Sequence, residues 1–156
     1  MLQAHGTSTR IGAAMQPVMD VEDLEAFLDR EFPQIHQDGR IYSVEAVGPG
    51  TARMRMRVGP RHIRPGGTLS GPTMMALADI ALYVAILAHV GPVALAVTTN
   101  LSFNFLRKPE PHDLLAECRL LKLGTRLAVG EVNLLSDGAA DPVCHATGTY
   151  SIPPRK

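Results

Sequence analysis

The sequence predicts an α+β domain in which one long central helix is wrapped by an antiparallel sheet of about six strands. The segment 71–88 is the first observation, because Ala, Leu and Met dominate it and apolar residues surround nearly the whole helix. The second is the order of the other segments, since two strand-like runs precede this helix and four follow it. One sheet covers only one side of such a helix, so we expect a second subunit to cover the rest.

The N-terminal segments predict an arm followed by a short helix. Residues 1–19 show no periodicity, and we expect a flexible arm there, with residues 20–156 forming a single domain. Asp20 is a candidate N-cap, the acidic residues behind it suit the first turn of a helix, and Pro33 ends the element.

The expected strands are identified by alternation and by the turn residues between them. Residues 51–58 place Arg side chains on one face and apolar side chains on the other, and Gly48-Pro49-Gly50 joins this run to the preceding one in a hairpin. The six predicted runs are 41–47, 51–58, 93–106, 114–123, 126–135 and 143–152.

Composition argues against several classes of partner. The 156 residues include 15 basic and 15 acidic side chains and no Trp, so we predict no nucleic-acid partner. The apolar run 74–90 is shorter than the roughly 20 residues that a bilayer requires and contains an acid, so we predict no membrane partner. Two widely spaced cysteines and the lack of a signal peptide indicate reduced thiols and a cytoplasmic location.

Asp79 is the candidate catalytic residue. It is the only acid between Glu45 and Glu110, and it lies in the middle of the apolar helix. Burying an ionised carboxylate costs several kcal/mol unless it is paired. Asp79 is therefore either a structural residue at a subunit contact or a general base or nucleophile.

The start of the same helix is a second candidate. Ser70 is the expected N-cap, Gly71 the first helical residue, and Pro72 lies in the first turn. The free N–H groups at this end can stabilise an oxyanion, and Gly allows a ligand to approach closely. Asp79 follows two turns later on nearly the same face. The alternative is that these residues simply begin a helix.

The strand after the helix carries polar residues at alternating positions. Thr98 and Asn100 belong to this polar face, which is either solvated or supplies hydrogen bonds to a substrate near Asp79. Arg107 and Lys108 end the strand, and they either form a solvated strand end or hold a phosphate. The histidines form no metal-binding pattern, so we predict no metal.

Three motifs occur in order between residues 61 and 109. They are Pro65-Gly66-Gly67-Thr68-Leu69-Ser70-Gly71-Pro72, Leu77-Ala78-Asp79 and Asn104-Phe105-Leu106-Arg107. This stretch resembles the PaaI-type acyl-CoA thioesterases of the hotdog superfamily, and the element order over 20–152 is similar to the hotdog fold. The resemblance implies a cytoplasmic homo-oligomer, either a dimer or a dimer of dimers. It also implies hydrolysis of acyl-CoA without a metal or organic cofactor, CoA being part of the substrate.

The resemblance also implies roles for single residues. The Gly71 N–H polarises the thioester carbonyl, and Asp79 activates a water or attacks directly. Thr98, contributed by the strand of the partner subunit, helps to place the water. We therefore expect each site to combine Asp79 of one chain with the hydroxyl and amide groups of Thr98 and Asn100 of the other.

The chain departs from the family at three positions near the substrate. Ser70 and Pro72 replace the His and the second Gly of the usual His-Gly-Gly helix start, and Arg64 stands where an Asn often contacts the reacting group. Pro72 leaves the Gly71 N–H in place. These changes motivate the alternative of a non-catalytic hotdog module that binds acyl-CoA or a partner protein. A hotdog hydratase is a third hypothesis, but it needs a His near the acid, and His62 could approach only through loop folding.

Overall fold

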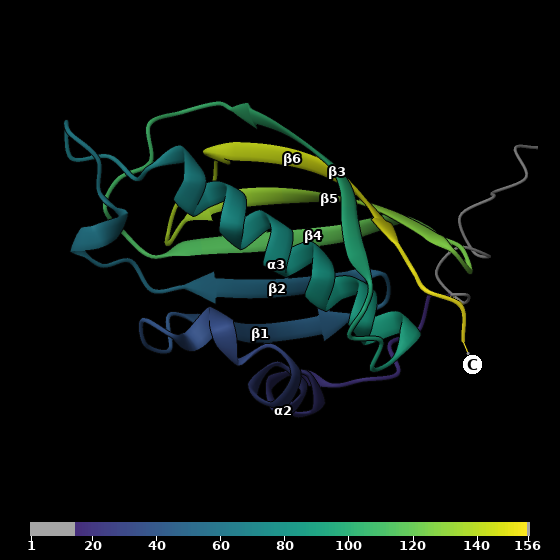
Figure 1. Cartoon of the computed structure of the whole chain (residues 1–156). Helices are drawn as coiled ribbons and strands as arrows, with labels where there is room; N and C mark the ends of the chain where they lie inside the picture. The colour runs from purple at the N-terminus through teal and green to yellow at the C-terminus, as the bar shows by residue number, and fades with distance from the viewer. Residues whose placement is uncertain (1–14, 156) are drawn as a thin grey trace, which may run out of the picture.

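The computed structural model describes residues 15–155 of the chain as two α-helices, two short 3₁₀ turns and six strands (Figure 1). The helices are α2 (Val21–Glu31) and α3 (Gly71–Val90), and the 3₁₀ turns are Pro33–His36 and Pro60–His62. The strands are β1 (Tyr42–Gly48), β2 (Thr51–Met56), β3 (Val97–Phe105), β4 (Leu114–Leu123), β5 (Leu127–Ser136) and β6 (Cys144–Ser151).

The six strands form one antiparallel sheet in the order β1-β2-β4-β5-β6-β3, with α3 packed across one face (Figure 1). The predicted α+β architecture is therefore confirmed. The helix approaches the sheet closely at two glycines. A Cβ atom placed on Gly130 or Gly148 would lie 2.5 or 2.6 Å from a Leu82 methyl group, respectively. Small residues at these positions allow α3 to press its apolar surface against the strands.

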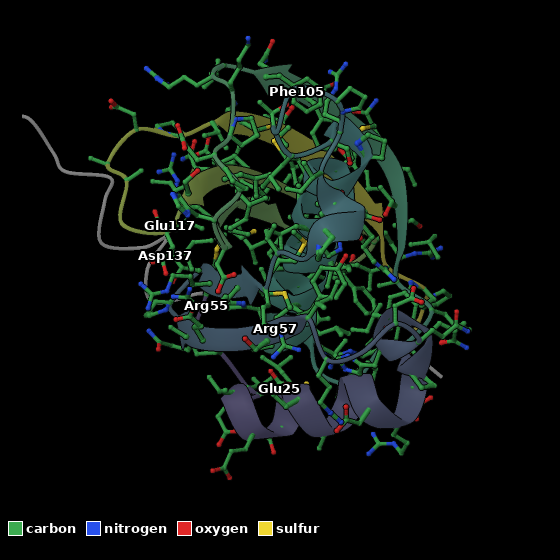
Figure 2. The ribbon with its side chains drawn as sticks, turned by 90° about the vertical axis from the view of Figure 1, so that its left-hand side faces the viewer. Glu25, Arg55, Arg57, Phe105, Glu117 and Asp137 are labelled. Atoms are coloured by element: carbon green, nitrogen blue, oxygen red, sulfur yellow. The ribbon has the colours of Figure 1, made fainter. Side chains whose placement is uncertain are left out.

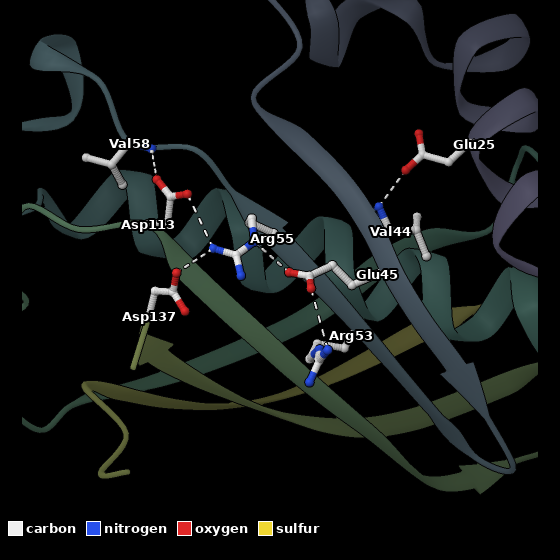
Figure 3. A network of polar contacts seen from close by, with 8 residues as sticks. All are labelled: Glu25, Val44, Glu45, Arg53, Arg55, Val58, Asp113 and Asp137. Atoms are coloured by element: carbon white, nitrogen blue, oxygen red, sulfur yellow. Dashed lines mark hydrogen bonds and ion pairs between the residues drawn. The ribbon is translucent and has the colours of Figure 1, made fainter. Parts of the chain in front are cut away.

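The two edges of the sheet differ in how they are covered. Helix α2 begins with a capping box in which Asp20 and Asp23 bond each other's backbone N–H groups, and it packs beside β1. From α2 the Glu25 carboxylate accepts a hydrogen bond of 2.5 Å from the Val44 N–H, where a bulge interrupts the β1–β2 pairing (Figure 3). Within the described residues, β3 at the other edge pairs only with β6.

The segment preceding α2 lies against the domain. The N–H groups of Val18 and Met19 both donate to the Ala88 carbonyl, at 2.7 and 3.2 Å, and the Met15 carbonyl accepts from the Gly50 N–H. Residues 15–19 of the expected arm are thus hydrogen-bonded to α3 and to the β1–β2 turn. The rest of that expected arm, residues 1–14, lies outside the described residues.

One predicted strand begins later than its sequence pattern indicates. The run 93–106 was expected to be extended throughout, but β3 starts at Val97. Residues 93–96 instead form a turn in which the Ala96 N–H donates to the Val93 carbonyl. The Tyr83 hydroxyl of α3 donates to the Ala94 carbonyl at 3.0 Å and holds this turn against the helix.

The outer face of the sheet carries an ion-pair network centred on Arg55. Its guanidinium contacts the carboxylates of Glu45 at 2.7 Å, Asp137 at 2.8 Å and Asp113 at 3.3 Å (Figure 3). These acids come from β1, from the turn after β5 and from the residue preceding β4, so one side chain of β2 joins neighbouring segments. The Arg55 hydrogen bond holds the pKa of Asp137 below its usual value.

We expect Arg55→Met to lower the melting temperature by several degrees at neutral pH, because it leaves three carboxylates without their shared cation. Arg57→Met is the matched control, since Arg57 is exposed and has no ion pair among the described residues. A depressed acid pKa stabilises the fold above the unfolded pKa of about 3.9 and ceases to do so as pH falls through the folded value. The melting difference between wild type and Arg55→Met should therefore shrink below about pH 4. A difference independent of pH would contradict this role.

Candidate active site

Asp79 is held to the sheet by two hydroxyl groups. The half-buried carboxylate lies midway along α3, and its Oδ1 accepts hydrogen bonds from Thr98 Oγ1 at 2.7 Å and from Tyr150 Oη at 2.6 Å. Tyr150 Oη also lies 3.0 Å from the Asp79 carbonyl oxygen. No described side chain donates to Oδ2, so one oxygen is anchored and the other is left to accept a proton.

Tyr150 is the member of this group that sequence reasoning missed. Burial, followed by its hydrogen bond to Asp79, raises the pKa of Tyr150, which keeps the hydroxyl protonated and able to donate. A signal was present in the sequence. Tyr150 falls on the inward-facing alternation of the last strand, and a buried Tyr hydroxyl generally requires a partner. Asp79, the candidate polar group on the buried helix, was available as that partner.

A bulge in β3 separates the two residues that the alternation placed on one face. Thr98 pairs with the buried Tyr150, whereas Asn100 pairs with Thr149, and Thr99 is the extra residue between them. Cross-strand neighbours share a face of the sheet, so Thr98 faces α3 and Asn100 faces outward. The prediction that Thr98 and Asn100 share one face of the strand is therefore wrong, because simple alternation cannot register an inserted residue.

The expected contribution of Thr98 from a partner subunit is also corrected. Thr98 reaches the Asp79 carboxylate of its own chain, because β3 runs beside α3 within one domain. The two groups form one preassembled unit.

The N-terminus of α3 has the predicted cap. Ser70 Oγ accepts from the Thr73 N–H at 3.3 Å, and the Ser70 carbonyl accepts from the Met74 N–H. Pro72 is exposed and has no N–H to offer. Within the described residues the Gly71 N–H has no acceptor, so it is the free donor of this helix end.

Gly71 and Asp79 of one chain are too far apart to act on one carbonyl group. Eight residues along a helix correspond to about 12 Å, whereas reacting groups must lie within about 3–3.5 Å of each other. An exposed stripe connects them on the helix surface, formed by Pro72, Met75 and Ala76. A Gly71 N–H can meet an Asp79 carboxylate only if the stripe packs against the same stripe of another copy.

The basic candidates all lie towards the N-terminal end of α3. Arg64 is exposed in the preceding loop, where the described residues offer its side chain no partner. Arg107 Nη1 donates to the Pro142 carbonyl at 2.7 Å, and the exposed Lys108 follows it. The next residue, Pro109, accepts from the Leu69 N–H near the helix cap.

His62 lies at the same end of the helix and not beside Asp79. Its carbonyl accepts from the Ser70 N–H at 2.9 Å, and its ring accepts from the Gly59 N–H. Burial, reinforced by the nearby charge of Arg61, lowers the pKa of His62. Within one chain His62 therefore lies beside the Gly71 end of α3 and away from Asp79.

The cysteines show no sign of a redox role. Cys118 and Cys144 are both reduced and buried, on strands separated by β5. Burial raises the pKa of Cys118 to about 12 and that of Cys144 to about 11, which leaves both thiols protonated at neutral pH.

Two other features concern metals and membranes. Within residues 15–155 no group of three or more His, Cys, Asp or Glu side chains is placed to hold a metal ion. Helix α3 is long and apolar enough to cross a membrane by length and composition, but 72% of its apolar window is buried, which identifies it as the core helix.

Comparisons with known proteins agree with this architecture. The thioesterase superfamily profile matches residues 66–142. The crystal structure of a candidate thioesterase from a Silicibacter species shares 52% identity, covers 90% of this chain and 96% of its own, and superposes with a TM-score of 0.82. Among curated proteins no sequence matches this chain significantly.

More distant structures show the same fold. A point mutant of the phenylacetic acid degradation protein PaaI from Thermus thermophilus is 27% identical, with coverage of 72% and 93% and a TM-score of 0.63. Zebrafish thioesterase superfamily member 2 is 21% identical, with coverage of 85% and 95% and a TM-score of 0.70, a likeness of fold alone. The sheet-wrapped central helix is thus the hotdog architecture. The chain belongs to the thioesterase superfamily.

The hydrogen bond between Tyr150 and Asp79 predicts how Tyr150 titrates. Among Tyr42, Tyr83 and Tyr150, we expect Tyr150 to ionise at the highest pH in an NMR titration of the tyrosine rings. Asp79→Asn should lower that pKa, because the negative charge that opposes ionisation is removed. Asp141→Asn, on the exposed turn before β6, is the control and should leave it unchanged. An unchanged Tyr150 titration in Asp79→Asn would show that the two side chains do not interact.

Proposed function

We propose that this protein hydrolyses acyl-CoA thioesters to the free acid and CoA. The observation that carries the proposal is the Asp79 carboxylate, with Oδ1 fixed by Thr98 and Tyr150 and Oδ2 open beside a pocket. Such a carboxylate is positioned to take a proton from water or to attack a carbonyl carbon directly. Membership of the thioesterase superfamily supports thioester hydrolysis as the reaction class.

In the general-base route, water adds to the thioester carbonyl while its proton passes to Asp79. The carbonyl oxygen becomes an oxyanion, which the Gly71 N–H of a second chain stabilises. The tetrahedral intermediate collapses, the carbon–sulfur bond breaks, and the proton returns from Asp79 to the leaving sulfur. In the nucleophilic route the carboxylate attacks the carbonyl carbon, the carbon–sulfur bond breaks, and CoA leaves as the thiolate, which takes a proton from solvent. Water then hydrolyses the mixed anhydride to the free acid and restores the Asp79 carboxylate. In both routes Thr98 and Tyr150 position Asp79.

The functional unit in this proposal is a homodimer, which a dimer of dimers also contains. Besides the helix stripe, β3 presents apolar side chains to solvent, with Val97 55% and Phe105 51% exposed. Phe105 lies at the end of the molecule opposite α2 (Figure 2). An open strand edge with exposed apolar residues is a surface that native proteins normally cover. A second copy would cover both surfaces and complete the site.

The remaining candidates surround the substrate in this scheme. Lys108, together with Arg107, would hold a CoA phosphate by charge-assisted hydrogen bonds. Arg64, Ser70 and Pro72 would line the approach to the Gly71 N–H. A cytoplasmic location is part of the proposal, supported by two reduced and buried cysteines.

We expect Asp79→Asn to reduce turnover of acyl-CoA by about a hundredfold to ten-thousandfold, as removal of a general base typically does. The assay is thiol release from a panel of short, long and aromatic acyl-CoA substrates. Glu117→Gln, on the outer face of the sheet (Figure 2), removes an acid elsewhere and should retain full activity. Equal turnover in wild type and Asp79→Asn would end the assignment.

The same panel tests the alternative of a non-catalytic acyl-CoA-binding module. Ser70 and Arg64 replace the family's His and Asn, which is the observation that favours this alternative. Tight binding of CoA esters, without turnover of any of them, would support it over the enzyme.

A pair of substitutions at Gly71 isolates the proposed oxyanion donor. Gly71→Pro removes the N–H, and Ser70 already has the extended backbone that precedes proline, with ψ of 150°. Gly71→Ala keeps the N–H, and its Cβ would make an ordinary 3.7 Å contact with Phe105. We expect turnover to fall about a hundredfold or more in Gly71→Pro and far less in Gly71→Ala.

Mixing variants tests whether two chains share a site. After subunit exchange between Asp79→Asn and Gly71→Pro chains, each mixed dimer would contain one site with both defects and one with neither. About half of the wild-type activity per mixed dimer should return. If activity stays as low as that of the two parent variants despite proven exchange, Gly71 and Asp79 act together within one chain and the shared-site model is wrong.

A further inference from the structure

A pocket with aromatic and aliphatic side chains over most of its lining opens beside the Asp79 carboxylate within one chain. Its volume is about 360 Å³, and it lies between the end of α2, the middle of α3 and the turn before β3. The aromatic rings of Phe32, Tyr83 and Tyr150 form one wall, with an edge-to-face contact at 6.1 Å followed by a stacked contact at 6.2 Å. Ala96 and Val97 contribute to the lining from β3 and the preceding turn.

The tyrosine hydroxyl groups of this wall already have hydrogen-bond partners. The Tyr83 hydroxyl donates to the Ala94 carbonyl, and the Tyr150 hydroxyl donates to Asp79. The rings therefore present mainly carbon to the pocket. Ligand pockets are commonly apolar with a few polar groups, and here the hydroxyls of Thr98 and Tyr150 gather at Asp79, while Glu31 lines the pocket at the end of α2.

We propose that this pocket receives the acyl group and restricts it to uncharged, compact chains or rings. The inference rests on the proposed thioesterase function and specifies its substrate class. With the thioester carbonyl at Asp79, the acyl carbons would extend along the Tyr83 ring towards Phe32 and Ala96.

The volume limits the size of the acyl group. At about 30 Å³ for each water-sized group, the pocket holds roughly a dozen non-hydrogen atoms. Hexanoyl and phenylacetyl groups are within that limit, whereas a palmitoyl chain exceeds it. Each additional buried methylene should increase kcat/KM by about fourfold until the pocket is full.

The charges around the pocket exclude anionic acyl groups. Its ionisable lining residues are Asp79, the two tyrosines and Glu31, which forms an ion pair with the exposed Arg30, and no Lys or Arg is among the residues that line the pocket. A nucleotide phosphate would meet the Asp79 carboxylate here and no lining cation, so the CoA end is placed elsewhere. A terminal carboxylate on the acyl group would be repelled in the same way.

A substrate series tests the proposal. Thioester hydrolysis is measured for acetyl-, hexanoyl-, phenylacetyl-, palmitoyl- and succinyl-CoA, with 4-methylpentanoyl-CoA as the uncharged isostere of succinyl-CoA. We expect kcat/KM to be highest for hexanoyl or phenylacetyl, and succinyl to be at least tenfold poorer than its isostere. A preference for palmitoyl or succinyl would overturn the proposal.

Two variants change the pocket in opposite directions. Ala96→Leu should fill it and reduce the hexanoyl-to-acetyl ratio of kcat/KM at least tenfold. Phe32→Ala, at the end of α2, should widen it and move the optimum to longer chains. The control Leu95→Phe changes a neighbouring residue that is 75% exposed and outside the lining, and should keep the wild-type ratio. Unaltered ratios in both folded pocket variants, with folding checked by melting temperature, would refute the assignment.

A binding measurement separates this inference from the proposed function. If wild type hydrolyses none of the thioesters, the function fails, and the pocket is then tested with the uncharged probes hexanamide and phenylacetamide. NMR shifts at Tyr83 that are lost in Ala96→Leu would support an acyl pocket in a non-catalytic protein. No binding by wild type together with no hydrolysis would overturn both claims.

Discussion

The structure depends on one requirement, that a helix apolar on nearly all sides be covered. Burial of apolar surface is the main favourable contribution to folding, and α3 concentrates that surface in one element. The sheet meets the requirement by curving around the helix and by approaching it closely at Gly130 and Gly148, where Leu82 fills the space that a side chain would take. The sheet leaves a single exposed stripe on the helix, and it is there that the Asp79 carboxylate meets solvent.

This arrangement gives a carboxylate an ordered position at low conformational cost. Asp79 stands on a rigid helix, and its two hydroxyl partners stand on neighbouring strands of a rigid sheet. None of the three depends on a loop for its position. The bulge at Thr99 turns Thr98 towards the helix while Asn100 faces outward, so a local irregularity of one strand gives the Asp79 carboxylate a hydroxyl partner.

Much of the fold could be predicted from the sequence because each element has a local signal. Asp20 and Ser70 are caps in the structure, and the long helix starts at Gly71 as its first turn indicates. Asp79 was identified because a carboxylate is costly in such surroundings.

What could not be predicted depends on geometry between distant segments. Alternation along β3 does not reveal an inserted residue, so Asn100 was placed on the wrong face. The partner of Asp79 on the last strand, Tyr150, lies 71 positions further along the chain. The separation of Gly71 from Asp79 follows from helical rise, but the exposed stripe between them depends on which residues of α3 the sheet leaves uncovered.

The unequal edges of the sheet also determine how copies of this protein can associate. At one edge, α2 and the Glu25 contact to Val44 occupy the place where another strand would dock. Within residues 15–155, only the β3 edge remains able to pair. If two molecules join through that edge by a two-fold axis, each uses its single open edge and none is left to recruit a third. Helix α2, which covers the far edge, would then limit the assembly to a closed pair and prevent growth into a fibre.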